Sequence, residues 1–157
     1  MTISKDHAHG TSGTETWEDF KPGAIAQRQF HRSKSSGLRF IGSSPDQGEL
    51  LFKQGDKQGP PVFFISGKDN GANLALVFLL PTPATEVTLG IELKEPDGVG
   101  AYDLVFIPAG KDGDPISKDI GTVTAIQPYL FKEPVKAFLI TGTGAKNGLG
   151  LSKISWS

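Results

Sequence analysis

Short runs of alternating apolar and polar residues follow one another along most of this chain, with turn-forming clusters between them. The clearest run is EVTLGIELKEP, in which every second residue from Val87 to Leu93 is apolar and the residues between them are polar or small. A period of two places one side of a strand on a core and the other side in water. We therefore predict a β-strand here, with residues 87, 89, 91 and 93 facing inward.

A second strand is predicted from the run LALVFLL, which is apolar at every position. Such a run fits a strand that is buried on both faces, although a short helix would show the same pattern. Its length and the glycine and proline around it favour a strand that ends at the prolines of PTP, residues 81–83. From Trp17 onward, the segments predict about ten strands and no helix, at the spacing of a β-sandwich or barrel.

The domain organisation follows from where this pattern begins. Residues 1–15 are polar and small and have no period, so we predict a flexible tail followed by one domain over residues 16–157. A chain of 157 residues can bury enough surface to fold without a disulfide or a metal. The 20 glycines and 11 prolines supply the turns that short strands need.

The glycine-rich segment TGTGAKNGLG near the end of the chain raises the possibility of a phosphate-binding loop. A Walker A loop needs a lysine directly after its last glycine, whereas Lys146 stands before Gly148. A helix must also follow such a loop, and the residues after Gly148 have no helical period. We therefore predict a tight connection between the last two strands.

The last strand is predicted from GLGLSKISW. Leu149 and Leu151 share one face, while Ile154 shares the opposite face with Trp156 if the strand is regular. This change of phase after Ser152 is what a β-bulge would produce. The alternative is a strand that is partly covered on both faces.

Charge and composition exclude several classes of function. The net charge is −1, with 16 basic and 17 acidic residues, so no strong field favours nucleic acid or an anionic membrane. The absence of cysteine excludes a disulfide framework, a thiolate metal site and a cysteine nucleophile. The longest apolar run falls far short of the ~20 residues that span a bilayer. The start of the chain lacks the apolar core of a signal peptide, so we expect a soluble protein.

Both ends of the predicted domain resemble a known family. The segment VKAFLITGTG and the final GLGLSKISW are similar to the carboxyl end of galactose-binding-like jelly-roll domains, which include carbohydrate-binding modules. The opening WEDFKPGAIAQRQF, with SGLRF after it, resembles the first strands of such domains. The resemblance covers about residues 16–157. It implies an all-β, jelly-roll-like sandwich of two antiparallel sheets.

The function that this resemblance implies is non-catalytic binding of carbohydrate through loops at one end of the sandwich. It also implies a secreted or cell-surface protein, of the kind common in bacteria. The alternative is a structural or assembly domain, such as part of a toxin, an adhesin or a virion, which would bind protein and form an oligomer.

The resemblance further implies a structural Ca²⁺ held between carboxylates near the first and last strands. Glu18 and Asp19 stand at the front, but the aligned position at the back is Ser152, a neutral and weaker ligand. Asp112 and Asp114, two residues apart in KDGDP, are a second candidate site for Ca²⁺. Later positions that an EF-hand loop requires are apolar here, so a plain turn is the favoured interpretation.

Aromatic residues that could support a sugar ring are few. The chain has two Trp and two Tyr. We expect Trp17 and Trp156 to pack in the core or at an edge. Tyr129, between Pro128 and Pro134, is the best candidate for an exposed platform on a loop-like segment, and a simple loop anchor is the alternative.

A basic segment, QRQFHRSKSSGLR, is the other candidate for ligand binding. It could contact a phosphate, a sulfated sugar or an acidic partner. We favour a solvated hairpin whose charges are balanced by Glu18, Asp19 and Asp46. The candidate ligand-binding residues of the whole chain are Tyr129, Arg28, Arg32, Arg39 and Asp46.

Catalysis has little support in the sequence. His7 and His9 lie in the predicted tail and make a poor metal site without a third ligand. His31 is then the remaining histidine for a catalytic triad, and no serine stands in a G-x-S-x-G motif. We therefore predict a protein that is not an enzyme.

Overall fold

The computed structural model describes residues 12–43, 49–53, 62–66, 72–93, 102–120, 125–145 and 149–157. These residues form strands joined by turns and contain no helix, which confirms the all-β prediction. None of them belongs to a helix that could span a membrane. The strands are β1 (Gly13–Glu15), β2 (Gly23–Ala24), β3 (His31–Arg32), β4 (Arg39–Ser43), β5 (Glu49–Lys53), β6 (Val62–Ser66), β7 (Ala72–Leu93), β8 (Tyr102–Pro108), β9 (Ile116–Lys118), β10 (Ala125–Ala145) and β11 (Leu149–Trp156).

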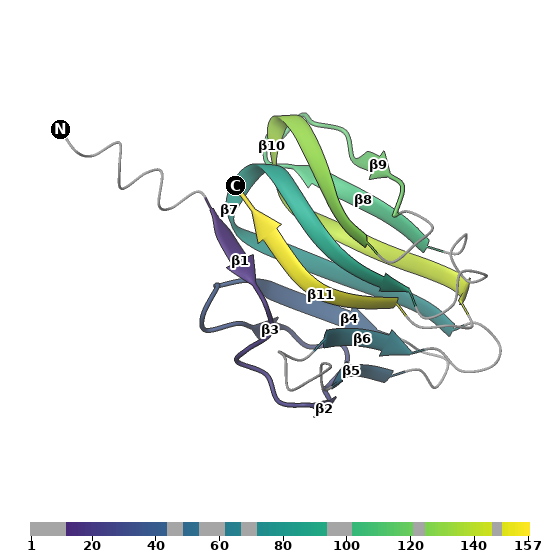
Figure 1. Ribbon diagram of the computed structural model, residues 1–157. Coiled ribbons are helices and arrows are strands. Elements are labelled where there is room, and N and C mark those ends of the chain that lie inside the picture. Colours follow the sequence, from purple (N-terminus) through teal and green to yellow (C-terminus); the bar gives the residue numbers. More distant parts are fainter. Residues whose placement is uncertain are drawn as a thin grey trace.

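The strands form two antiparallel layers because β7 and β10, of 22 and 21 residues, bend and belong to both. The early part of β7 pairs with β4 and with the late part of β10, and the late part of β10 pairs with β8. This layer, with β3 and β9 at its edges, is the first sheet. The second sheet consists of the early part of β10, the late part of β7, β11, β6, β5 and β2, with β1 along β11 (Figure 1).

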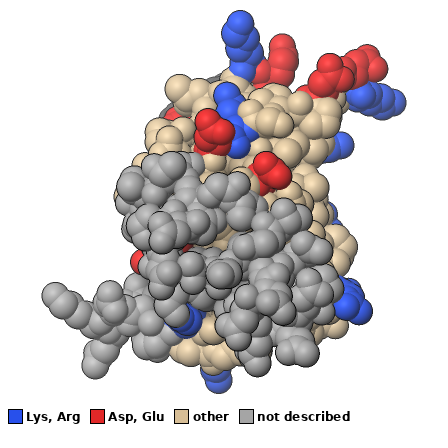
Figure 2. Space-filling view, turned by 90° about the vertical axis from the view of Figure 1, so that its right-hand side faces the viewer, with Lys and Arg blue, Asp and Glu red and all other residues tan. Residues whose placement is uncertain are grey.

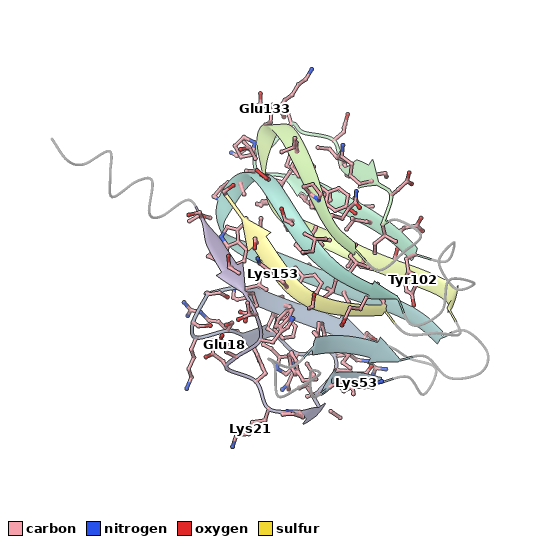
Figure 3. All side chains as sticks on the ribbon, in the orientation of Figure 1. Glu18, Lys21, Lys53, Tyr102, Glu133 and Lys153 are labelled. Atoms are coloured by element: carbon pink, nitrogen blue, oxygen red, sulfur yellow. The ribbon has the colours of Figure 1, made fainter. Side chains whose placement is uncertain are left out.

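Prolines occupy the bends at which the long strands pass from one sheet to the other. Pro81 and Pro83 lie in the bend of β7, and Pro134 lies in the bend of β10, where the pairing register shifts. Glu133 labels this second bend at the top of Figure 3. Proline cannot donate to the ladder of hydrogen bonds, so a bend that interrupts the ladder accepts it. The predicted strand end at residues 81–83 is therefore wrong, because β7 continues to Leu93.

Aromatic side chains fill the space between the sheets. The Trp17 ring lies 5.6, 5.5 and 5.4 Å from the rings of Phe40, Phe52 and Phe63. The Trp17 Nε1 also donates a hydrogen bond of 2.7 Å to the carbonyl oxygen of Leu151 in β11. This satisfies the one polar atom of a fully buried indole and links the start of the domain to its last strand. The core position predicted for Trp17 is confirmed.

The domain begins before residue 16, which corrects the predicted boundary of the tail. Gly13 and Glu15 of β1 pair with Trp156 and Ile154 of β11. Glu15 is fully buried, and its carboxylate accepts hydrogen bonds from the backbone N–H of Trp17 at 2.7 Å and the hydroxyl of Ser36 at 2.5 Å. Residues 1–11 lie outside the described residues.

The two strands with the clearest patterns behave as predicted. Val87, Leu89 and Ile91 are buried, as a period of two requires. The pairing of β11 with β7 shifts at Ser152, which confirms the predicted β-bulge. Gly90 accommodates this bulge, because a Cβ at that position would lie 2.4 Å from the Ser152 hydroxyl oxygen.

Candidate functional site: the outer face of the first sheet

Residues that alternate with the core form the outer face of the first sheet. In β4, Phe40 is buried, and the next residue, Ile41, points away from the core. In β8, Val105 likewise points outward beside the buried Phe106. The strand period of two therefore gives these strands a second, independent surface.

Four aliphatic side chains lie in one row across this outer face. Pairing places Ile41 beside Val77, Val77 beside Leu139, and Leu139 beside Val105. Residues opposite one another on neighbouring strands point to the same side of a sheet, so the four form a continuous stripe, which we call the aliphatic band. The next row on the same face contains Leu79, Ala137 and Ile107.

An apolar surface at this place is unusual, because the face of an antiparallel sheet that meets water is normally polar. The four residues of the aliphatic band are only half-buried, so each still presents apolar surface to the outside. Contiguous exposed apolar surface often marks the place where another molecule binds. The outer face of the first sheet is therefore the candidate binding face.

A polar hollow of about 500 Å³ borders the binding face at β8 and β9. Asp103 and Thr141 are opposite one another at the β8–β10 pairing, and Ser117 of β9 is opposite Val105. Lys118 and Asp119 complete the polar part of the lining. Carboxylate, hydroxyl and ammonium groups thus surround one end of the aliphatic band, and such groups orient a ligand by hydrogen bonds.

Tyr102 lines the same hollow, close to the end of β8 that lies away from the bend of β10 (Figure 3). Its side chain is 8% exposed. Burial raises the pKa of its phenol to about 12, because a buried site disfavours the charged phenolate. The phenol therefore stays protonated further into the alkaline range than an exposed tyrosine does.

A smaller hollow of about 230 Å³ lies at the opposite end of the aliphatic band, beside β4. Ile41, Val77 and Ala75 provide an apolar floor, and Arg28 stands among the lining residues. The backbone N–H of Arg28 donates a hydrogen bond of 2.8 Å to the carbonyl oxygen of Gly42. Arg28 has a φ of 62°, a left-handed conformation that is uncommon for residues other than glycine. Its backbone is thus fixed in an unfavourable conformation at the rim of the hollow.

Two further arginines lie on the neighbouring strands β3 and β4. Arg32 of β3 and Arg39 of β4 are directly opposite one another in the hairpin, and both are exposed. Ligand binding by Arg28, Arg32 and Arg39 stays a prediction, and the structure places all three near one edge of the first sheet. Asp46, the acidic residue predicted to accompany them, lies outside the described residues.

The acidic residues predicted to balance these arginines have other partners or stand apart. The Asp19 carboxylate accepts hydrogen bonds from the Ser35 backbone N–H at 2.7 Å and the Ser33 hydroxyl at 3.0 Å. These hydrogen bonds, first of all those from Ser35, hold the pKa of Asp19 below its usual value. Glu18 is exposed beside it. Asp19 therefore stabilises the turn over residues 33–36, and in the described part of the chain it forms no ion pair with the arginines.

Tyr129 does not provide an exposed platform, and this prediction is wrong. The residue lies within β10, not in a loop, and its side chain is 6% exposed. Its hydroxyl donates a hydrogen bond of 2.8 Å to the carbonyl oxygen of Asp119. Burial, and secondarily the charge of Asp119, raise the pKa of Tyr129 to about 12. Its ring packs 5.3 Å from that of Phe106, so it serves the core.

No metal site emerges among the described residues, where no three His, Asp or Glu side chains come together. Asp112 and Asp114 are exposed in the turn that follows β8. Calcium binding at Glu18, Asp19, Asp112 and Asp114 stays a prediction. The ring of His31 stacks on Phe40 at 5.3 Å, and its Nε2 donates a hydrogen bond of 2.8 Å to the carbonyl oxygen of Ala26.

The outer face of the second sheet has a different chemistry. Thr88, Ser155 and Thr14 lie in one row across β7, β11 and β1, and the hydroxyl oxygens of Thr14 and Ser155 are 3.3 Å apart. Ile126 and Leu130 of β10, which are 71% and 69% exposed, border this face at its edge. This row of hydroxyl side chains is the polar surface expected of a solvated sheet.

Comparisons with known proteins identify the fold. No model of a known protein family matches this chain, and no curated protein matches its sequence. Among solved structures, the K2 cleaved adhesin domain of Lys-gingipain is similar with a TM-score of 0.52 and 18% identity, over 93% of this chain and 99% of that one. TmCBM61, solved in complex with β-1,4-galactotriose, has a TM-score of 0.50 and 10% identity, over 74% and 87% of the two chains.

These likenesses confirm the jelly-roll-like β-sandwich predicted from the sequence. The fold is the one found in carbohydrate-binding modules and in an adhesin domain. At this level of identity the likeness concerns the fold, so the function must be argued from the side chains of the binding face.

The sequence did not reveal the aliphatic band, although it contains one signal that favours it. LALVFLL is apolar at every position, which predicted burial on both faces. In the structure, Leu76, Phe78 and Leu80 are buried, whereas Val77 and Leu79 lie on the outer face. An apolar run in an antiparallel sheet thus indicates either two buried faces or one buried face and one apolar face on the outside of the sheet.

Proposed function

We propose that this chain is a non-catalytic module that binds carbohydrate on the outer face of the first sheet. The observation that carries the proposal is the aliphatic band with a polar hollow at the end formed by β8 and β9. The fold shared with a galactotriose-bound carbohydrate-binding module is consistent with it.

The chemistry of the binding face suits a sugar. A pyranose ring has C–H groups on one face and hydroxyls around its rim, so it needs an apolar surface beside polar groups. Val105 and Leu139 offer the apolar surface, and Asp103 and Thr141 lie next to them. A carboxylate such as that of Asp103 accepts charge-assisted hydrogen bonds from hydroxyl donors.

This site differs from the one expected from the sequence, which relied on an exposed aromatic ring. All four Trp and Tyr residues of the chain are buried: Trp17, Tyr102, Tyr129 and Trp156. In our proposal, aliphatic side chains replace the aromatic platform. We therefore expect moderate affinity, since a half-buried aliphatic contact offers less than stacking on a large ring.

A glycan array followed by titration calorimetry tests the proposal. The wild-type chain and Asp103→Ala are compared with Asp112→Ala, a matched control in the exposed turn outside the hollow. We expect the wild type and the control to bind the same glycans and Asp103→Ala to lose about tenfold or more in affinity. Absence of binding to any glycan, or equal binding by all three proteins, would overturn this assignment.

The competing hypothesis, an assembly domain, predicts a different result. The aliphatic band would then be buried between protein chains. Sizing chromatography of the wild type and of Leu139→Thr distinguishes the two. A stable oligomer that Leu139→Thr dissociates, together with an empty glycan array, would replace the carbohydrate assignment by assembly.

A further inference from the structure

The basic group, defined as Arg28, Arg32 and Arg39, gives the binding face a charge that plain sugar binding does not use. We infer that the ligand is an acidic polysaccharide, whose carboxylate or sulfate groups contact this basic group while its sugar rings cover the aliphatic band. The inference rests on the proposed carbohydrate binding and specifies its ligand class.

Two like charges are paired at the hairpin of β3 and β4. Arg32 and Arg39 are directly opposite one another on β3 and β4, so both side chains leave the sheet on the same side. Like charges at such a position destabilise a sheet. Among the described residues, no carboxylate lies within ion-pair distance of either arginine. An anion between the two guanidinium groups would remove the repulsion and add charge-assisted hydrogen bonds.

Two carboxylates near the β3–β4 hairpin, those of Asp19 and Glu15, are already engaged in hydrogen bonds, whereas Glu18 is exposed. Asp19 accepts hydrogen bonds from Ser33 and Ser35, on the turn that joins β3 to β4. Glu15 is buried and accepts hydrogen bonds from Trp17 and Ser36. Both carboxylates therefore stabilise the hairpin that carries the arginines and leave the positive charge of Arg32 and Arg39 available to a ligand.

Arg28 lies farther along the same edge of the sheet. Its backbone is bonded to Gly42, whereas Arg39 is at the beginning of β4. Three residues of extended strand separate the two backbone positions, roughly 10 Å at about 3.3 Å per residue. Ile41 and Val77 form the floor beside Arg28. The edge thus presents positive charge on both sides of an apolar floor. A short oligosaccharide is long enough to reach from one charge to the other.

The charges at the opposite end of the face set the direction of the ligand. Asp103 and Asp119 line the hollow at β8 and β9, and both are exposed. They repel an anion, and their carboxylates favour hydroxyl donors instead. The acidic groups of the ligand therefore belong at the β3–β4 edge, and its uncharged hydroxyls belong in the polar hollow.

The basic group is local rather than part of a positively charged molecule. The net charge of the chain is −1, and basic and acidic side chains stand close together along the upper margin of the side view in Figure 2. A protein that binds the phosphates of nucleic acid usually has a basic stripe and a positive net charge. A short basic edge beside an aliphatic floor favours a polymer that has both charged groups and rings with C–H faces.

Binding to matched pairs of polysaccharides tests the inference. The probes are polygalacturonate with its carboxyl-reduced product, and dextran sulfate with dextran, measured by calorimetry at two salt concentrations. The proteins are the wild type, the double variant Arg32→Gln/Arg39→Gln, and Lys111→Gln as a control for charge in the exposed turn after β8. Circular dichroism and thermal melting verify that each variant is folded.

We expect at least one acidic polymer to bind about tenfold or more tightly than its neutral partner, and this difference to shrink in high salt. The double variant should lose that difference while Lys111→Gln keeps it. The preference between polygalacturonate and dextran sulfate then shows whether carboxylate or sulfate is the recognised group.

Three results would overturn the inference, and they can be told apart. Neutral polymers that bind as tightly as acidic ones would leave the carbohydrate proposal intact and remove the acidic ligand. Failure of all polymers and of the glycan array would remove both. Duplex DNA that binds as tightly as the best acidic polysaccharide would show that the protein recognises negative charge alone and not a polysaccharide.

Arg39→Lys provides a second variant that keeps the charge. Lysine preserves the positive charge but loses the planar fork that binds carboxylate or sulfate with two parallel hydrogen bonds. We expect the affinity of Arg39→Lys for the acidic polymer to lie between the affinities of the wild type and of the double variant. Wild-type affinity in Arg39→Lys and in the double variant would assign the arginines a merely solvated role.

Discussion

The two faces of the first sheet are made by adjacent residues of the same strands, yet they have different structural roles. Phe78 of β7 is fully buried and stacks on Phe138 at 4.8 Å, whereas its neighbour Val77 belongs to the aliphatic band. The inner face is apolar and buried, with several phenylalanine rings, whereas the outer face combines half-buried aliphatic side chains with polar ones. Apolar character alone therefore does not tell which side of a strand builds the fold.

What separates the two faces is the presence of partners. Inner side chains meet the second sheet, as Phe40 meets Phe63 at 5.2 Å. In the described part of the chain, outer side chains such as Ile41 and Val105 lie beside neighbours on the same face and stay half-buried. The inner face thus contributes burial and packing to folding, while the outer face leaves apolar surface that our proposal assigns to the ligand.

The largest effect is expected from the pair Phe78→Ala and Val77→Ala. Removing a buried phenyl ring costs about 3–5 kcal/mol, because it leaves a cavity that the closed core fills only in part. Truncating the half-buried Val77 should cost about 1 kcal/mol or less, since the site opens to solvent. Urea denaturation measures both changes. Val77→Ala should also weaken glycan binding.

Equal destabilisation of the domain by Val77→Ala and Phe78→Ala would contradict the different roles of the two faces. That result would mean that the outer face is covered in the folded protein and belongs to the core. Unchanged glycan affinity in Val77→Ala would separate the aliphatic band from the ligand.

A smaller effect is expected from two carboxylates that stand three residues apart. Glu15 is buried and accepts two hydrogen bonds, whereas Glu18 is exposed. Glu15→Gln replaces one acceptor oxygen by an amide donor next to an existing donor, at a cost of about 1–3 kcal/mol in the free energy of unfolding. Glu18→Gln should change stability by no more than about 0.5 kcal/mol.

Thermal melting of the two variants checks this difference. Glu15→Gln with the stability of the wild type would show that β1 and the turn at residues 33–36 do not depend on the buried carboxylate. It would also weaken the argument that this carboxylate holds the arginine-bearing hairpin in place.

A sequence pattern predicts structure reliably when only one structure explains it. The period of two in Val87, Leu89 and Ile91 is explained by a strand with a single buried face, and the structure confirms this strand. The change of phase at Ser152 also has one explanation, because an extra residue must be accommodated in the ladder.

The predictions based on proline were wrong because proline occurs in more than one structural setting. The sequence predicts the end of a strand at Pro83 and the border of a loop at Pro134, which is where proline usually lies. In this fold they stand at bends of strands that continue into the other sheet. The choice is decided by tertiary pairing between β7 and β10, which no local window of sequence contains.

The candidate site shows the same limit. Arg28, Arg32 and Arg39 were predicted together because they are close in sequence. The β8–β9 hollow was missed because Asp103, Ser117 and Thr141 come from three strands. Only the register of β8, β9 and β10 brings them together. The prediction of an exposed platform at Tyr129 was wrong because local sequence was followed too closely. The flanking prolines suggested a loop where the chain forms a strand.

The smallest effect concerns the two tyrosines, Tyr102 beside the polar hollow and Tyr129 of β10, whose ring packs on Phe106. Burial raises the pKa of Tyr102 and of Tyr129 to about 12. A phenol whose pKa is higher in the folded state favours folding fully below its unfolded pKa, near 10, and loses this contribution as pH rises toward the folded value. Stability should therefore decline on the alkaline side between these two values.

A titration of the near-ultraviolet absorbance of tyrosinate measures this directly, because the chain has only these two tyrosines. We expect no transition at the ordinary tyrosine pKa and a late rise at higher pH. Asp119→Asn should move one of the two tyrosines, Tyr129, to a lower pKa, because the charge of Asp119 contributes to its shift. A tyrosine that titrates normally in the folded wild type would place its phenol in water, and for Tyr102 it would mean a hollow more open than the structure shows.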